Sequence, residues 1–196
     1  MDKGQNQQVE IYGLCGTIGV GKSEALKRLA QSGLLELAAP AGTIIEYVQE
    51  PVELWRREGY LAQFYEDKEK NALPFQMIVY MTHIDALREA KDRGRLRASS
   101  SEGGRSKVII LTERTLFDHR IFWEIQPSQN NLANIAYRMS WDKWNEFLPI
   151  PKRMFYFRTS TPDITTKRRL ARSRTEEDGI PQWYTDALHN KHEQLY

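Results

Sequence analysis

The stretch Gly16-Thr17-Ile18-Gly19-Val20-Gly21-Lys22-Ser23 matches the spacing G-x-x-x-x-G-K-[ST] without a gap. Residues 9–15 before it suit a β-strand, and residues 24–30 after it suit a helix with its apolar positions on one face. A P-loop requires this context, because its glycines let backbone N–H groups curl around phosphate oxygens at the start of a helix. An ordinary Gly-rich turn is the alternative. The complete motif and its flanks favour a nucleotide-binding P-loop.

Within this loop, two side chains have expected roles of their own. Lys22 is expected to reach the outer phosphates of a nucleotide, and the Ser23 hydroxyl is expected to ligate Mg²⁺. A P-loop indicates a nucleotide but leaves open which group receives the γ-phosphoryl group.

The composition indicates one soluble domain that spans residues 1–196. Lys and Arg number 28 and Asp and Glu 26, and the net charge of +2 does not imply a nucleic-acid partner. Apolar runs stay far below the roughly 18 residues that a membrane span needs. The N-terminus lacks the features of a signal or transit peptide, and a single cysteine, Cys15, fits a reducing compartment. We therefore expect a cytoplasmic protein without a membrane partner.

Strand and helix patterns alternate along the rest of the chain. Strands are predicted over residues 43–48, 107–114 and 153–158, and helices in part of 55–71, over 74–93, 116–125 and 134–147, and in a final stretch ending at Tyr196. Residues 94–107 are small, polar and basic without periodicity, which predicts a flexible loop. The alternation predicts an α/β fold with a parallel sheet flanked by helices.

Polar residues follow three of the predicted strands, where ligands bind in such sheets. The P-loop follows the first strand, Glu50 the second, and Glu113 and Arg114 end the third. An acceptor hydroxyl needs a carboxylate to take its proton, whereas a phosphate acceptor calls for a cation. The segment Gln49-Glu50-Pro51 offers only the carboxylate, which favours an alcohol as acceptor.

The doublet Glu113-Arg114 suits the phosphate side of the reaction. Glu113 can hold Mg²⁺ directly or through water, and Arg114 can clamp phosphates or a reacting oxygen. A salt-bridged pair at a strand end is the alternative.

A basic segment lies after the fourth predicted strand. Arg168 and Arg172 are one helical turn apart, and with Arg174 they are expected to form an Arg-rich lid, about residues 167–179, over the transferring phosphoryl group. The alternatives are a solvated helix face or a nucleic-acid contact.

Together these residues resemble the deoxyribonucleoside kinase family, which holds deoxycytidine, deoxyguanosine and mitochondrial thymidine kinases. Glu50-Pro51-Val52 with Trp55 is similar to the family's E-P-V-x-x-W, and Glu113-Arg114-Thr115 to its E-R-S. Tyr65 and Phe75-Gln76 keep the spacing of its sugar-binding tyrosine and base-binding Phe-Gln pair. Residues 168–181 resemble the R-x-x-x-R-x-R-x-E-E-x-G-I-P lid, and residues 188–193 resemble L-H-x-K-H-E. The resemblance covers nearly the whole chain.

The resemblance implies a P-loop kinase fold, a homodimer, and Mg²⁺-dependent phosphorylation of deoxyribonucleosides by ATP at the 5′-hydroxyl, a salvage route to DNA precursors. It implies that Glu50 is the general base, assisted by Arg114. Ser23 and Glu113 would serve Mg²⁺, Lys22 the phosphates, and Arg168 and Arg172 the transferring phosphoryl group, with Arg172 and Arg174 also contacting ATP. The implied nucleoside contacts are Tyr65 and Glu177 at the 3′-hydroxyl, Gln76 at the base edge, and Phe75, Trp55, Leu61 and Trp123 around the base.

Three substrate-site positions depart from the cytidine and purine enzymes of this family. Val79, His83 and His119 stand where those enzymes have a small residue, an arginine and an aspartate. Val79 is similar to thymidine-accepting members, and loss of the Arg-Asp pair leaves room near C5 of the base. This predicts a preference for thymidine and other pyrimidines, with broad specificity; the alternative is that both imidazoles are structural. The end at Tyr196 resembles compact viral members, which implies a reduced donor-adenine site and the host cytosol as location; a shortened chain is the alternative.

Two other functions stay open. A nucleoside monophosphate kinase of thymidylate type would need cations near Glu50, where only Arg56 and Arg57 lie close in sequence. A non-catalytic nucleotide-binding regulator, or a nucleic-acid-binding ATPase, would use residues 93–107 and 167–174 as basic contacts. The net charge of +2 argues against a nucleic-acid partner.

Overall fold

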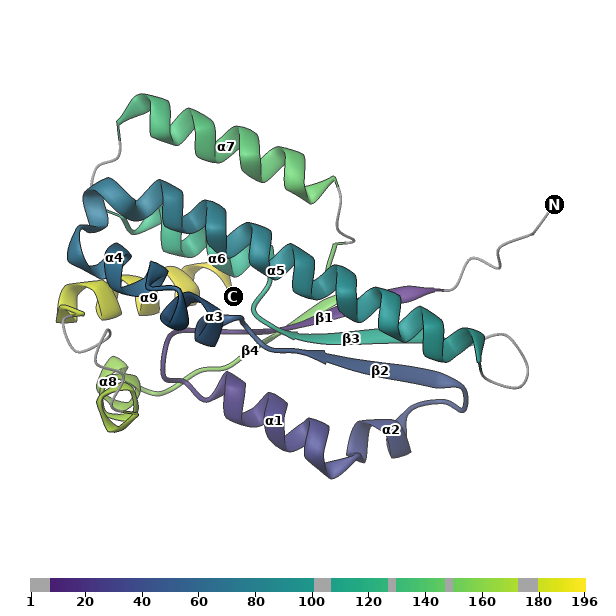
Figure 1. Cartoon of the computed structure of the whole chain (residues 1–196). Helices are drawn as coiled ribbons and strands as arrows, with labels where there is room; N and C mark the ends of the chain where they lie inside the picture. Colours follow the sequence, from purple (N-terminus) through teal and green to yellow (C-terminus); the bar gives the residue numbers. More distant parts are fainter. Residues whose placement is uncertain (1–7, 101–106, 127–129, 147–149, 173–179) are drawn as a thin grey trace.

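A four-stranded parallel sheet forms the centre of the molecule (Figure 1). The computed structural model describes residues 8–100, 107–126, 130–146, 150–172 and 180–196, and for residues 144 and 145 the backbone alone. The strands are β1 (Val9–Cys15), β2 (Thr43–Val48), β3 (Lys107–Glu113) and β4 (Arg153–Tyr156), in the order β2-β3-β1-β4. All neighbouring pairs are parallel, which confirms the predicted α/β fold.

Helices cover both faces of this sheet (Figure 1). On one face lie α1 (Lys22–Ser32) and α2 (Leu34–Ala38), and across the other runs α5 (Lys68–Ser99). The short helices α3 (Val52–Arg57) and α4 (Tyr60–Glu66) connect β2 to α5. The remaining helices are α6 (Leu116–Glu124), α7 (Asn131–Asn145), α8 (Pro162–Ala171) and α9 (Gln182–Leu195). None of these described helices combines the length and apolar character that crossing a bilayer needs.

Helix α5 is longer than the sequence pattern predicts at both ends. It begins at Lys68, where the carboxylate of Asp67 accepts the Lys70 backbone N–H at 3.0 Å, and it continues to Ser99. The flexible loop predicted over 94–107 therefore begins too early. Gly94 lies inside the helix, and a Cβ there would come within 2.5 Å of Val108 Cγ1, so this glycine lets the helix lie directly on β3.

Two other predicted boundaries also shift. The strand predicted over 153–158 ends at Tyr156. The helix predicted over 134–147 begins at Asn131, with the Asn130 side chain accepting the Ala133 backbone N–H at 2.8 Å. Of the predicted lid, α8 contains residues up to Ala171, and residues 173–179 lie outside the described part of the chain.

Two apolar clusters hold α5 and the helices around it in place. One packs α5 against the sheet, with Ile11, Val108 and Ile110 buried beneath Leu87. The other joins α3, α4, α5, α6 and α7 beyond the edge of the sheet; its buried residues are Trp55, Leu61, Phe64, Ala72, Phe75, Val79, Tyr80, Leu116, Trp123, Ala133 and Tyr137. The second cluster builds a wall that faces the carboxyl ends of the strands.

Candidate active site

The carboxyl ends of β1, β2 and β3 meet at one cavity of about 710 Å³. The P-loop follows β1, Glu50 follows β2, and Arg114 follows β3; all three contribute to the cavity lining. In a parallel sheet the carboxyl ends of the strands share one edge, so their following residues converge there. The predicted convergence of these residues is confirmed.

The P-loop has a backbone that only glycine fits. Gly16 has a φ of +135° and Gly19 of +81°, and a Cβ at either position would lie 2.5 Å from a backbone carbonyl oxygen. The Lys22 amine donates to the carbonyls of Gly16 and Thr17, each at 2.9 Å. Burial, followed by the charge of Arg114, lowers the pKa of Lys22 to about 8. A cation thus lies inside the curl of the loop.

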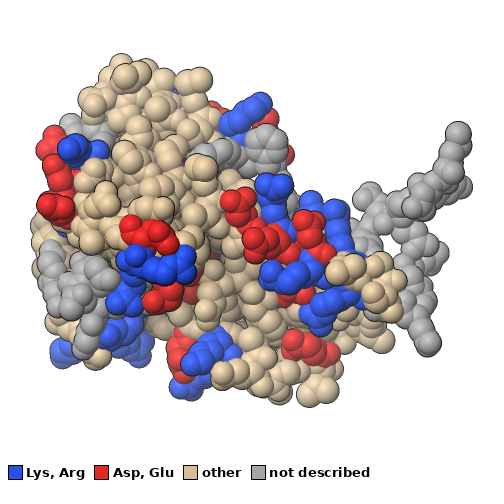
Figure 2. All heavy atoms as spheres, viewed as in Figure 1, with Lys and Arg blue, Asp and Glu red and all other residues tan. Residues whose placement is uncertain are grey.

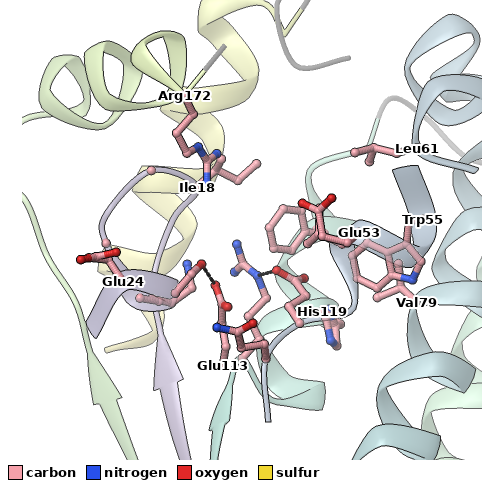
Figure 3. Close-up of a pocket in the computed structure, with 18 of the residues that line it drawn as sticks. Ile18, Glu24, Glu53, Trp55, Leu61, Val79, Glu113, His119 and Arg172 are labelled. Atoms are coloured by element: carbon pink, nitrogen blue, oxygen red, sulfur yellow. Dashed lines mark hydrogen bonds and ion pairs between the residues drawn. The ribbon is translucent and has the colours of Figure 1, made fainter. Parts of the chain in front are cut away.

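Ser23 and Glu113 meet at the start of α1. The Ser23 hydroxyl donates to Glu113 Oε1 at 2.6 Å (Figure 3). Both are oxygen ligands of the kind that Mg²⁺ prefers, and Mg²⁺ takes its other ligands from water and substrate phosphates. Among the residues that the structure describes, no group of three or more His, Cys, Asp or Glu could hold a metal. The two oxygens of this pair fit an Mg²⁺ that takes its other ligands from water and the phosphates of a nucleotide.

Arg114 links Glu50 to the P-loop. Its Nε donates to Glu50 Oε2 at 3.0 Å and its Nη1 to the Gly16 carbonyl at 3.0 Å, while the guanidinium lies 4.5 Å from the centre of the Phe122 ring. Arg114 is 3% exposed and has a φ of +65°, a conformation that is strained for a residue with a side chain. In this backbone conformation the guanidinium lies between Glu50 and the P-loop carbonyl of Gly16.

Asp118 accepts hydrogen bonds from Thr115, which follows Arg114, and from Gly16 of the P-loop. Its Oδ2 accepts the backbone N–H and the hydroxyl of Thr115 at 3.0 and 3.1 Å, and its Oδ1 accepts the Gly16 N–H at 3.4 Å and lies 3.5 Å from His192 Nε2. Burial alone would raise the pKa of Asp118, but hydrogen bonding to His192 and the charge of Arg114 outweigh it and lower the pKa. The sequence analysis missed Asp118, although the spacing Thr115-x-x-Asp118 suits a capping box.

Apolar and aromatic side chains form the wall opposite the P-loop. Figure 3 shows Ile18 and Arg172 on the P-loop side, and Trp55, Leu61 and Val79 on the other. The predicted nucleoside contacts that line the cavity are Trp55, Leu61, Tyr65, Phe75, Gln76, Val79 and His119. Gln76 is 3% exposed, and its Oε1 has no hydrogen-bond partner in the described part of the chain. A buried polar atom of this kind calls for a hydrogen-bond partner, which a molecule in the cavity can supply.

The two predicted histidines form a chain that ends at the cavity. His119 lines the cavity and its Nε2 lies 2.7 Å from His83 Nδ1; His83 Nε2 lies 3.0 Å from the Thr112 hydroxyl. All three residues are at most 1% exposed. Burial lowers the pKa of His83 to about 4 and lowers that of His119 well below its usual value. Both rings are therefore neutral at pH 7.

The other predicted site residues differ in whether they line the cavity. Arg168 and Arg172 line the cavity, and Arg168 Nη1 donates to the Val20 carbonyl at 3.1 Å. Trp123 is not among the residues that line the cavity, because its ring stacks on Tyr137 at 4.4 Å within the helical cluster. Arg174 and Glu177 lie outside the described residues. The lining residues that sequence analysis did not assign to the site are Glu24, Ala25, Arg28, Gln49, Val52, Glu53, Phe64, Phe122 and Tyr184.

Known proteins resemble both the sequence and the fold. The family model for deoxynucleoside kinases matches residues 14–196. The probable deoxycytidine kinase of fowlpox virus is 29% identical over 191 residues, covering 91% of this chain and 68% of the viral protein, and mouse deoxycytidine kinase is 25% identical over 214 residues, covering 96% and 76%. A structure of deoxyadenosine kinase from M. mycoides, with the products dCMP and a flexible dCDP bound, has a TM-score of 0.69 at 23% identity, over 95% of this chain and 83% of that one. Because the family model spans almost the entire sequence, this chain belongs to the deoxynucleoside kinase family.

Proposed function

We propose that this chain transfers the γ-phosphoryl group of ATP to the 5′-hydroxyl of deoxyribonucleosides. Its family supports nucleoside phosphorylation with ATP as donor. The observation that carries the choice of acceptor is the Glu50–Arg114 pair beside the P-loop. A carboxylate held there can take the proton of a hydroxyl, whereas the phosphate acceptor of a monophosphate kinase would be repelled by it.

The remaining charged groups suit the phosphate side of the transfer. Lys22, Arg168 and Arg172 face the P-loop side of the cavity and would stabilise the charge on the transferring phosphoryl group. Ser23 and Glu113 would hold Mg²⁺, which neutralises charge on the β- and γ-phosphates when bound. The roles of Arg174 and Glu177, and cytoplasmic residence, remain predictions.

The apolar wall suits a nucleoside. Trp55 and Phe75 meet edge to face at 5.7 Å, and Gln76 offers the carboxamide that can read a base edge. Tyr65 is assigned to the 3′-hydroxyl. The preference for thymidine and other pyrimidines also stays a proposal, and two relatives that are named deoxycytidine kinases favour deoxycytidine among those pyrimidines.

An exposed apolar face supports the proposed homodimer. Leu132, Ile135 and Met139 of α7 are spaced to share one side of the helix, and they are 75%, 43% and 68% exposed. Figure 2 shows that much of the surface over α7 and the adjacent part of α5 carries no charged side chain, whereas charged side chains gather toward the C-terminal end of α5. We propose that this face binds a second copy of the chain, which sedimentation equilibrium would show as a dimer. A Leu132→Glu and Met139→Glu double variant would sediment as a monomer, and a dimer in that variant would contradict the assignment.

The proposed activity is tested with Mg²⁺-ATP, each of four deoxyribonucleosides, and thymidine monophosphate. We expect deoxyribonucleoside monophosphates as products from at least one nucleoside and no diphosphate from thymidine monophosphate. Turnover of the monophosphate alone would replace this proposal by a thymidylate-type kinase. Binding of ATP without turnover of any nucleoside would contradict it.

A further inference from the structure

Two buried histidines and a threonine from three different elements form one hydrogen-bonded chain. Thr112 belongs to β3, His83 to α5 and His119 to α6. The His83 and His119 rings meet edge to face at 5.0 Å and 83°, with 2.7 Å between His83 Nδ1 and His119 Nε2. The other nitrogen of His83 bonds to the Thr112 hydroxyl at 3.0 Å. The bond to His83 occupies Nε2 of His119, so Nδ1 is the nitrogen that remains for a ligand in the cavity.

A neutral imidazole carries one donor and one acceptor, so this chain has two arrangements. In the first, His119 Nε2–H donates to His83 Nδ1, His83 Nε2–H donates to Thr112 Oγ1, and His119 Nδ1 is an acceptor. In the second, the Thr112 hydroxyl donates to His83 Nε2, His83 Nδ1–H donates to His119 Nε2, and His119 Nδ1–H is a donor. Both carry the same number of protons, so neither changes the net charge of the site.

The Thr112 hydroxyl can serve either arrangement. Its Oγ1 lies 3.5 Å from the Glu113 carbonyl, which offers it a second acceptor when His83 donates to it. The lowered pKa of each histidine keeps both rings neutral, so a switch between the arrangements moves no net charge beside Glu50, Arg114 and Asp118. A hydrogen bond from the ligand to His119 can therefore shift the balance between them.

We propose that Thr112, His83 and His119 form a tautomeric relay that lets His119 Nδ1 accept a hydrogen bond from an amino base or donate one to a carbonyl base. At C4 of a pyrimidine or C6 of a purine, cytosine and adenine present an exocyclic amino group, whereas thymine and guanine present a carbonyl oxygen. The inference rests on the proposed function, since it needs a nucleoside base against His119, near Val79 (Figure 3). Gln76 Oε1, which has no hydrogen-bond partner among the described residues, belongs to the same cavity lining. One site would then accept both base classes without a change of charge. His119 is the specificity-determining residue, and His83 and Thr112 are positioning residues.

Thr112→Val tests the relay, because valine keeps the shape of threonine and removes the hydroxyl. A His83 Nε2–H would then face a methyl group, and an orphaned buried N–H is less tolerable than an orphaned acceptor. The variant should settle in the second arrangement, with His119 Nδ1–H as a donor. We expect kcat/KM for deoxycytidine relative to thymidine to fall about tenfold. Thr112→Ser should restore the ratio, and Thr43→Val in β2, outside the cavity lining, should leave it unchanged.

NMR of the imidazole nitrogens of the wild-type protein gives an independent measurement. Saturation with deoxycytidine should give a His119 with a bare Nδ1, and saturation with thymidine a His119 with a protonated Nδ1. The same tautomer with both nucleosides, or a ratio within twofold of wild type in Thr112→Val, would overturn the relay. A wild-type protein that phosphorylates no nucleoside would instead overturn the proposed function, so the two failures are distinguishable.

Discussion

Glu50→Gln separates proton transfer from every other task of the site. Glutamine keeps the length of the side chain and an oxygen that can accept from Arg114 Nε. In the wild-type protein this nitrogen donates to Glu50 at 3.0 Å. It cannot take a proton from a hydroxyl. Loss of a general base costs about 10²–10⁴ in kcat, which corresponds to about 3–5 kcal/mol of transition-state stabilisation. KM for ATP should change little, because the P-loop contacts of Lys22 and Ser23 remain.

Folding and general charge effects are controlled separately. Arg114 is 3% exposed, and replacing its ionic partner by a neutral one should lower the free energy of unfolding by about 1–3 kcal/mol. Thermal melts therefore set an assay temperature at which the variant is fully folded. Glu53→Gln is the matched control: Glu53 also lines the cavity, but its side chain is 74% exposed and pairs with Arg56 at 3.2 Å. A Glu50→Gln variant within tenfold of wild-type kcat would refute the general-base assignment.

Three further predictions concern stability. Burial gives His83 a pKa of about 4 in the folded protein against 6.5 normally, so between pH 6.5 and 4 only the unfolded chain takes up this proton. His119, whose pKa is also lowered, adds a second such proton, so stability should fall by up to about 2.7 kcal/mol per pH unit in that window, as measured by urea unfolding. A flat profile from pH 7 to 5 would count against the neutral rings. In Gly94→Ala the added methyl group would collide with Val108, which should lower the free energy of unfolding by about 1–3 kcal/mol and outweigh the helix-propensity gain of about 1 kcal/mol. A variant more stable than wild type would show that α5 packs more loosely on β3 than the structure indicates. Asp118→Asn should cost about 1–3 kcal/mol, because an amide accepts at one oxygen where the carboxylate accepts from Thr115 and Gly16 at two, and an unchanged urea midpoint would contradict those bonds.

The sequence was most informative where a short motif or an apolar run decides the local structure. The P-loop spacing requires glycines at Gly16 and Gly19 whatever the rest of the chain does, and the run at residues 108–111 is apolar because β3 is buried between layers. With these strands placed, Glu50 and Arg114 had to meet at one edge of the sheet. This is why the fold and the polar centre of the cavity followed from the sequence.

Tertiary contacts decide what the sequence left open. Gly94 looks like a helix terminator, but its missing side chain serves the contact between α5 and Val108. Asp118 reaches His192, and His83 reaches Thr112, across separations in the chain that no local pattern records. The place of Trp123 against Tyr137 is likewise a packing outcome, because an aromatic residue in a helix suits a core and a binding wall equally well.

The position of the phosphate on the product tests the central claim most directly. The protein is incubated with Mg²⁺-ATP and a deoxyribonucleoside that it turns over, and the product is analysed by phosphorus NMR with proton coupling. Transfer to the 5′-hydroxyl beside Glu50 predicts a phosphorus coupled to the pair of C5′ protons. A phosphorus coupled to the single C3′ proton would place the other hydroxyl at Glu50 and contradict the account.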